Sequence, residues 1–187
     1  INNIFSTYLI DSEISFINNF KENKNIKISG EFLEVISKSL YYCDLSNGSY
    51  DITVAPLVEL WGFGKNKEQV IPTQNIINEK LKQIGYENIL IDNQLLRKKN
   101  SLLSIDLNSI AKGYAVDEVY NMLIRMGYKN FLVEIGGELR SSSVDGYSWL
   151  IGIANPLSNS IINKIELNNF SMATSGTYNN YFIISFW

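Results

Sequence analysis

Apolar residues recur along the chain with two different periods, which predicts a mixture of helices and strands. Between positions 32 and 40 they are spaced three and four residues apart, as on one face of a helix that begins after Ser29. A second helix is expected after Thr73, with its apolar residues directed inward and Gly85 as its C-terminal cap. Residues 52–64 are apolar and punctuated by glycine, so they are expected to form a strand or turn followed by a loop.

The stretch "SIDLNSIAKGYAVDEV", residues 104–119, changes period in its middle. Its first residues predict a short buried strand. The rest predicts an amphipathic helix that ends at Gly127, with Met122 and Met126 on its apolar side. Further strands are expected in "NILID", "NFLVEI", "SWLIGIA" and "INKIELN". This order of elements predicts an α+β fold, with mixed, largely antiparallel sheets and packed helices, and not a doubly wound sheet.

Composition narrows the possible functions without naming one. The chain has 187 residues, of which 45% are hydrophobic and 19% charged, as expected for a globular domain with its own core. Its formal net charge is -3 and it has no basic stripe, so nucleic acid is not an expected partner. The one cysteine, Cys43, is interpreted as a small buried side chain in an apolar helix. These residues include no histidine, which excludes Ser-His-Asp catalysis and zinc sites built on imidazole within them.

Both ends of the sequence lack the usual signals of a start and a stop. It begins "INNIFSTY" without methionine, and it ends in the apolar run "NNYFIISFW" without a turn. We therefore interpret residues 1–187 as a single domain that is incomplete at its N- and C-terminus. Any targeting segment is expected to lie outside this sequence.

Polar residues gather where the strand of residues 104–119 is expected to become a helix. Asp106 would end the strand, and Asn108 and Ser109 would start the helix. One interpretation is structural: Asn108 or Ser109 caps the helix and Asp106 assists. The other is functional, because unpaired N–H groups at a helix start attract anions and a neighbouring carboxylate can hold a hydroxyl, a ring N–H or a metal-bound water. Lys112 is unfavourable to the helix dipole there, which suggests either exposure or a ligand.

Three other stretches combine small, hydroxyl-bearing and bulky residues. In "NGSYDITVAPLVELWGFG", Tyr50 offers a flat face to an aromatic ring, and Trp61 is either a core anchor or part of a flexible binding loop. "EIGGEL" places Glu134 and Glu138 around two glycines, as a hairpin turn or as part of a site. "ATSGTYNNY" sets Thr174 close to a glycine, which either forms a turn or lets the backbone approach a ligand.

Taken in order, five stretches resemble the motifs of the ApbE family, the FAD:protein FMN transferases. They are "STYLIDSEISFIN", "SNGSYDITVAPLVELWGFG", "IDLNSIAKGYAVDEV", "FLVEIGGELRS" and "MATSGTYNNY", and together they cover nearly the whole chain. The resemblance implies an ApbE-like (T-fold-like) architecture. It also implies Mg²⁺-dependent transfer of the FMN moiety of FAD to a threonine hydroxyl of a target flavoprotein, with release of AMP. In such a reaction FAD is the substrate, and metal charge and positioning carry most of the catalysis.

The resemblance also implies roles for particular residues. Ser109 matches the family's metal position, through its backbone carbonyl. The family's His-x-x-Asp-Pro-x-Thr-Gly stretch, which supplies the remaining metal ligands, does not occur in these residues, so the catalytic residues stay unassigned. The residues that match FAD-contacting positions are Tyr8, Ser49, Tyr50, Asp51, Asp106, Lys112 and Leu167.

Two other functions stay open beside the transferase. One is a non-catalytic module that binds FAD, and the other is an FAD pyrophosphatase that gives FMN and AMP. The family resemblance implies an acceptor flavoprotein with a threonine flavinylation site as the partner. It also implies a location at the extracytoplasmic face of the bacterial inner membrane. Contact with the membrane is then expected only through a lipid anchor outside this sequence.

Overall fold

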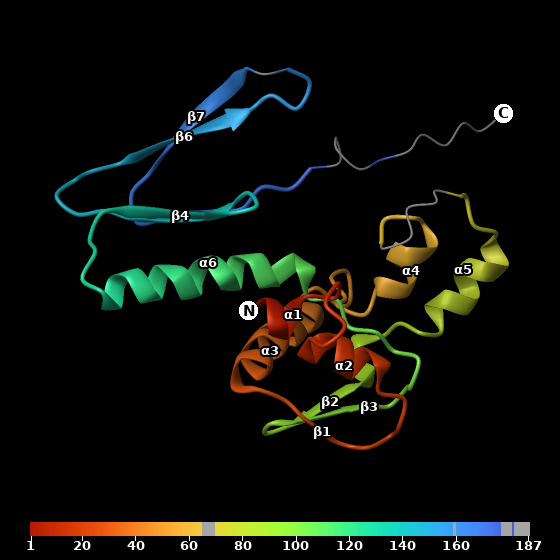
Figure 1. Ribbon diagram of the computed structural model, residues 1–187. Coiled ribbons are helices and arrows are strands. Elements are labelled where there is room, and N and C mark those ends of the chain that lie inside the picture. The colour runs from red at the N-terminus through yellow and green to blue at the C-terminus, as the bar shows by residue number, and fades with distance from the viewer. Residues whose placement is uncertain (65–69, 159, 177–180, 182–187) are drawn as a thin grey trace. The chain divides into compact units, whose positions relative to one another are not determined.

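The computed structural model describes residues 1–64, 70–158, 160–176 and 181 (Figure 1). The described chain divides into two compact units, Ile1–Ala111 and Lys112–Tyr181, and the boundary falls within helix α6 (Asn108–Arg125). Every strand pair that the structure describes is antiparallel. The expected α+β class with antiparallel sheets is therefore confirmed, whereas the expected single domain stays a prediction.

The first unit combines several helices with a small sheet. The sheet has three antiparallel strands in the order β1-β3-β2. The strands are β1 (Ile26–Lys27), β2 (Ile89–Asp92) and β3 (Leu95–Lys98). The helices are α1 (Asn2–Phe5), α2 (Glu13–Asn19), α3 (Gly30–Leu45), α4 (Ala55–Leu60) and α5 (Gln74–Leu81), and a 3-10 turn, η1, covers Tyr86–Asn88.

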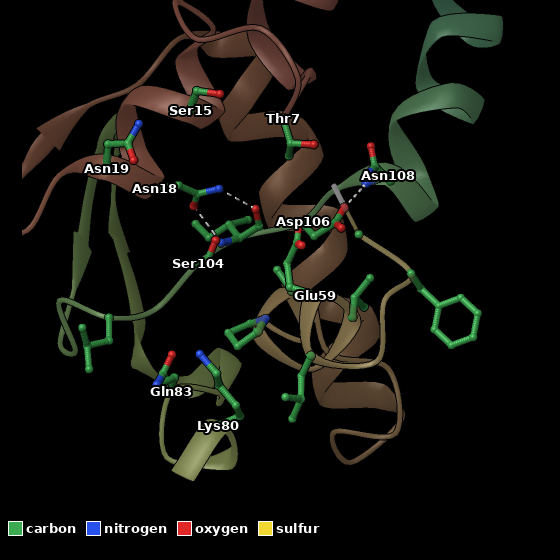
Figure 2. A pocket seen from close by; sticks show the side chains of 18 of the residues that line it. Thr7, Ser15, Asn18, Asn19, Glu59, Lys80, Gln83, Ser104, Asp106 and Asn108 are labelled. Carbon is green, nitrogen blue, oxygen red and sulfur yellow. Dashed lines mark hydrogen bonds between the residues drawn. The ribbon is translucent and has the colours of Figure 1, made fainter. Parts of the chain in front are cut away.

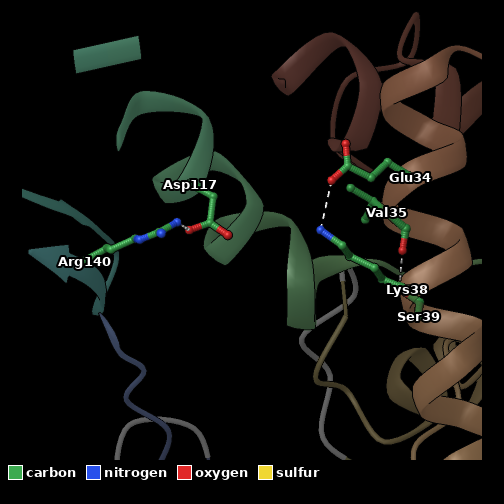
Figure 3. Close-up of polar contacts among 6 residues, drawn as sticks. All are labelled: Glu34, Val35, Lys38, Ser39, Asp117 and Arg140. Carbon is green, nitrogen blue, oxygen red and sulfur yellow. Dashed lines mark hydrogen bonds and ion pairs between the residues drawn. The ribbon is translucent and has the colours of Figure 1, made fainter. Parts of the chain in front are cut away.

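Helix α3 forms where the apolar spacing predicts it. The Ser29 side chain caps it by accepting a hydrogen bond from the Phe32 N–H at 3.1 Å, and its own hydroxyl donates to Glu13 of α2. Within the helix, the buried Ser39 hydroxyl donates to the Val35 carbonyl at 2.9 Å (Figure 3). The buried face of α3 consists of Phe32, Val35, Ile36, Ser39 and Cys43, which confirms the interpretation of the cysteine.

Three local predictions around helices α4 and α5 are wrong or only partly right. Residues 55–60 form helix α4 instead of a strand or loop, because Pro56 lies in its first turn, where a fixed φ and a missing N–H are no disadvantage. The apolar residues expected on the inner side of helix α5 are only partly so: Ile77 and Ile84 are half-buried, whereas Ile76 is 47% exposed and Leu81 is 49% exposed. Gly85 does not cap α5 but precedes η1 with a φ of 136°, a conformation that favours glycine.

The second unit is built on two antiparallel sheets. They have the strand orders β4-β5-β8 and β6-β7. The four strand runs expected from the sequence all form, "NILID" as β2 and the other three in this unit. The strands of this unit are β4 (Phe131–Ile135), β5 (Glu138–Ser142), β6 (Trp149–Ala154), β7 (Ile161–Leu167) and β8 (Ser171–Met172).

Helix α6 packs against strand β4 (Figure 1). Val116 of the helix lies in one cluster with Phe131 and Val133 of the strand. The helix ends as expected, with Gly127 just beyond it at a φ of 87°. Its C-terminal methionines are exposed, so the expectation that Met122 and Met126 lie on the buried face is wrong. The apolar end of the sequence lies outside the described residues, apart from Tyr181.

Candidate functional site

Two cavities in the first unit share a wall formed by Asp106 and Asn108. The larger has a volume of about 570 Å³, and the smaller about 300 Å³. Polar side chains that line the larger cavity include Thr7, Ser15, Asn18, Asn19, Glu59, Lys80, Gln83 and Ser104 (Figure 2). The smaller cavity is lined by Ser49, Tyr50, Asp51, Ile52, Val54 and Ser109, in addition to the shared wall.

The segment that carries Asp106 is not the strand that the sequence predicts. Residues 103–107 are in no strand, although Leu103, Ile105 and Leu107 are fully buried. Their polar backbone groups pair outside a sheet. The Asp106 N–H donates to the Ile52 carbonyl at 2.7 Å, and the backbone groups of Leu103 and Leu107 also have backbone partners close in sequence. The N–H and carbonyl of Ile105 and the carbonyl of Leu103 pair with side chains. Buried and less buried side chains alternate along this segment as they do along a strand, although no strand lies beside it. This alternation explains why the sequence pattern predicts a strand here.

The Asp106 carboxylate serves the start of helix α6 and also faces the larger cavity. Its Oδ1 accepts a hydrogen bond from the Asn108 N–H at 2.7 Å (Figure 2). Asp106, and not Asn108 or Ser109, therefore supports the first turn of the helix. Its Oδ2 has no hydrogen-bond partner in the part of the chain that the structure describes. The structural and functional interpretations of this residue are thus compatible, since the two oxygens can have different partners.

Asp51 has a structural task beside the smaller cavity. Its Oδ1 accepts from the backbone and the hydroxyl of Thr53, at 2.7 Å and 2.6 Å, and its Oδ2 accepts from the Tyr86 N–H at 3.2 Å. The buried Thr53 hydroxyl in turn accepts from the Gly85 N–H at 2.8 Å. The Asp51 carboxylate therefore holds the loop that forms the cavity wall, and a ligand contact of this residue stays a prediction.

Tyr50 and Ser109 meet across the smaller cavity. Their hydroxyl groups are 2.9 Å apart, which is a hydrogen bond in either direction. This bond fixes the Tyr50 ring beside the start of α6. Tyr8 lies at the larger cavity and is 72% exposed, so a large part of its ring can meet a ligand.

The structure brings some of the predicted site residues together and places others elsewhere. Lys112 belongs to the second unit, where its Nζ lies 3.1 Å from Glu138 Oε2 and 3.4 Å from the Gly136 carbonyl. Leu167 also belongs to that unit, where it is buried in strand β7 opposite Trp149. The residues gathered at the two cavities of the first unit are Tyr8, Ser49, Tyr50, Asp51, Asp106 and Ser109.

The described residues do not make a complete magnesium site. Among them, no three or more Asp, Glu, Cys or His side chains come together in a way that could hold a metal ion. The predicted ligand, Ser109, offers one neutral carbonyl oxygen, whereas Mg²⁺ requires near-octahedral oxygen coordination. Its hydroxyl is already paired with Tyr50.

The sequence-based predictions missed Lys98, a buried cation beside the larger cavity. Its side chain is only 2% exposed, and its Nζ donates to the carbonyls of Ile17, Asn18 and Leu103 at 2.8, 3.3 and 3.2 Å. Burial, and secondarily the charge of Lys21, lowers the pKa of Lys98 to about 8. The signal was present in the sequence, since Lys98 lies two residues after Leu96 and therefore on the same, buried face of β3.

Almost the whole chain matches one protein family. The sequence model of the ApbE family covers residues 1–185. The chain belongs to the ApbE family. An ApbE-family relative from Vibrio cholerae, named FAD:protein FMN transferase, is 38% identical over 187 residues, which cover 97% of this chain and 56% of the relative. The relative of the same name from Escherichia coli K12 is 31% identical, over 96% of this chain and 54% of its own length.

Solved ApbE structures have the same fold. The flavin transferase ApbE from Vibrio cholerae aligns with a TM-score of 0.87 at 36% identity, over 98% of this chain and 61% of that one. The ApbE protein from Thermotoga maritima aligns with a TM-score of 0.86 at 33% identity, over 96% and 60% of the two chains. The ApbE-like architecture is thus confirmed. The chain spans about half the length of the curated ApbE relatives it matches.

Proposed function

We propose that this chain binds FAD across its two cavities, and that the protein it belongs to transfers the FMN moiety of FAD to a protein acceptor. The observation that carries the proposal is the shared wall of Asp106 and Asn108 between two cavities, in a chain whose relatives are named FAD:protein FMN transferase. FAD has two ring systems joined by a pyrophosphate, and adjoining cavities suit such a molecule. Cavities of several hundred cubic ångströms are of the size that binds cofactors.

The shared wall is better suited to the neutral hydrogen-bond donors of FAD than to its phosphate groups. A helix N-terminus normally attracts anions, but here the Asp106 carboxylate already accepts from the first N–H of α6. A second negative group at the same place would be repelled. The other carboxylate oxygen is suited to accept a hydrogen bond from a ring N–H or a ribose hydroxyl. The exposed Tyr8 ring offers a stacking surface at the same cavity.

The finer parts of the proposal rest on the family resemblance. The acceptor group is a threonine hydroxyl, whose oxygen forms a bond to the phosphorus on the FMN side. The bond from that phosphorus to the bridging oxygen breaks, AMP leaves with the bridging oxygen, and the hydroxyl proton is released to solvent. Mg²⁺ is included only through the resemblance, because the described residues do not complete a site for it.

The cellular setting is also proposed from the resemblance. The acceptor would be an exported flavoprotein, and the full-length enzyme would act at the extracytoplasmic face of the inner membrane through a lipid anchor. No helix among the described residues has the length and apolar content needed to cross a membrane.

One incubation separates the three candidate functions. The full-length protein is mixed with FAD, Mg²⁺ and a threonine-bearing acceptor, with an acceptor carrying Thr→Ala at that position as the matched control. A flavin that stays on the acceptor through denaturing electrophoresis supports the transferase. Free FMN and AMP without labelled acceptor would favour the pyrophosphatase, and unchanged bound FAD would favour the binding module. Omission of Mg²⁺ with added EDTA tests the metal dependence separately.

A further inference from the structure

The side chain of Asn18 pairs with the backbone immediately before Asp106. Its Oδ1 accepts a hydrogen bond from the Ile105 N–H at 2.7 Å, and its Nδ2 donates to the Ile105 carbonyl at 2.9 Å (Figure 2). These two bonds connect helix α2 to a residue 87 positions later in the sequence. They give Ile105 the same pair of hydrogen bonds that a neighbouring antiparallel strand would give.

Asn18 is itself held in place by Lys98. The Lys98 Nζ donates to the carbonyls of Ile17 and Asn18 at the end of α2, and also to the Leu103 carbonyl. The last carbonyls of a helix have no partner within the helix, and a cation there is favourable to the helix dipole. Lys98 therefore attaches the end of α2 to Leu103, and Asn18 binds the same segment two residues further on, at Ile105.

We propose that Asn18 is a positioning residue for FAD binding, which fixes the Ile105 backbone and so sets the direction of the Asp106 carboxylate. This inference rests on the proposed binding of FAD at the two cavities. The segment has no neighbouring strand to fix its backbone torsions, so its geometry depends on the contacts of Asn18, Lys98 and Ile52. Of the two side chains that hold the segment, Asn18 is bonded nearer to Asp106, since it pairs with the residue immediately before it.

Direct contact between Asn18 and the ligand is the competing explanation, because Asn18 also lines the larger cavity. One amide hydrogen and one lone pair of its side chain remain after the two bonds to Ile105. The two explanations differ in how they depend on Asp106. A residue that acts through Asp106 loses its effect when the carboxylate is removed, whereas a residue that contacts FAD itself keeps it.

The decisive experiment is a double-mutant cycle on FAD affinity. FAD fluorescence is titrated with the wild-type chain, Asn18→Ala, Asp106→Ala and the double variant. Asn18→Ala is expected to weaken binding roughly threefold to tenfold in the wild-type background, and less than about twofold when Asp106 is already alanine. Equal effects in both backgrounds would overturn the positioning role while leaving FAD binding intact. Failure of the wild-type chain to bind FAD would instead overturn the proposed function on which the inference rests.

A second measurement reports on the carboxylate without any ligand. The Asn108 amide hydrogen is protected by Asp106 Oδ1, so its exchange rate follows the position of that side chain. Asn18→Ala should accelerate exchange at Asn108, which Asn18 does not touch, and an unchanged rate would contradict the inference. Ile36→Val, which removes a methyl group from the core of α3, serves as the destabilised control. It should change neither the FAD affinity nor the Asn108 exchange rate relative to wild type.

Discussion

Two extended segments of this chain have the same burial pattern and are held by different means. In residues 103–107 every second side chain is buried, and in strand β4 the same alternation leaves Phe131 and Val133 buried and Ile135 half-buried. Strand β4 is paired with β5 from Phe131 to Ile135 through backbone hydrogen bonds. Residues 103–107 are held by the side chains of Asn18 and Lys98, by a backbone bond to Ile52 and by backbone bonds to residues close in sequence at either end.

The difference explains how a polar residue can be presented at a cavity. A β-ladder satisfies the backbone by placing another strand alongside, which occupies the edge of the segment. Side chains satisfy the same groups from a distance and leave space beside the backbone for a cavity. The cost is a buried cation, since Lys98 is desolvated with carbonyl partners and has no carboxylate within ion-pair distance among the described residues. We expect this segment to depend on single residues more strongly than the hairpin does.

The largest effect should come from removing the cation. Lys98→Met leaves the buried carbonyls of Ile17 and Leu103 without this donor and removes a third bond, to Asn18, whose carbonyl keeps Lys21 as a donor. It is expected to lower the free energy of unfolding by about 2–4 kcal/mol. The matched change in the second unit is Arg140→Met, which removes a partly exposed ion pair with Asp117 (Figure 3) and also the stacking of Arg140 on Tyr120. It should cost only about 1 kcal/mol. Urea denaturation measures both, and equal losses would remove the contrast between the two regions.

The next largest effect should come from Asp106, which residues 103–107 place at the two cavities. Asp106→Ala should weaken FAD binding by about 1.5–3 kcal/mol, the typical contribution of a charge-assisted hydrogen bond. Asp92→Ala, at the end of strand β2, is the control, because that aspartate also ends an extended segment but is exposed and lines neither cavity. FAD fluorescence titration alongside thermal melting separates affinity from stability. Normal affinity with a lowered melting temperature would leave Asp106 with only its role at the helix start.

The β4–β5 hairpin should be most sensitive to substitution at its turn. Gly136 has a φ of 61°, and a Cβ added there would lie 3.3 Å from Lys112 Cδ. Gly136→Ala is therefore expected to lower the free energy of unfolding by about 1 kcal/mol or slightly more. Gly113→Ala is the matched control in helix α6, where an added Cβ has no neighbour within 4 Å, and it should raise stability by about 0.5–1 kcal/mol. Destabilisation by both changes would show that the turn geometry is not the cause.

The smallest effect is a pH dependence that belongs to Lys98. Burial lowers its pKa from 10.5 to about 8, so above pH 8 the folded state loses a proton that the unfolded state keeps. The unfolded state then binds more protons, and stability rises with pH between these values. Between pH 7 and pH 9 the wild type should gain on the order of 1 kcal/mol relative to Lys98→Met. The Lys98→Met variant provides the baseline because it keeps Cys43. Burial raises the pKa of Cys43, so this thiol lowers the stability of the fold as the pH rises above the ordinary pKa of a thiol. A constant difference between the two proteins across this range would contradict the lowered pKa.

Periodicity predicted the elements that depend on local sequence and on one buried face. Helix α3 and its cap at Ser29, the glycine after α6, and strands β4, β6 and β7 all form where the pattern indicates. The pattern failed in part at α5, where Ile76 and Leu81 are exposed, and it failed at α4, where a proline at the helix start resembled a strand or loop signal. In each failure the residue types were compatible with two structures, and packing chose between them.

The sequence by itself determined the family, the antiparallel α+β class and the concentration of polar residues around Asp106. These follow from motif order, apolar spacing and turn residues, which are local properties of the chain. Only the tertiary structure decided that residues 103–107 form no strand, and that Asn18 and Lys98 replace its missing neighbour. A hydrogen bond between residues 87 positions apart leaves no periodic trace in the sequence, because it depends on where the fold places α2 and not on the spacing of neighbouring residues.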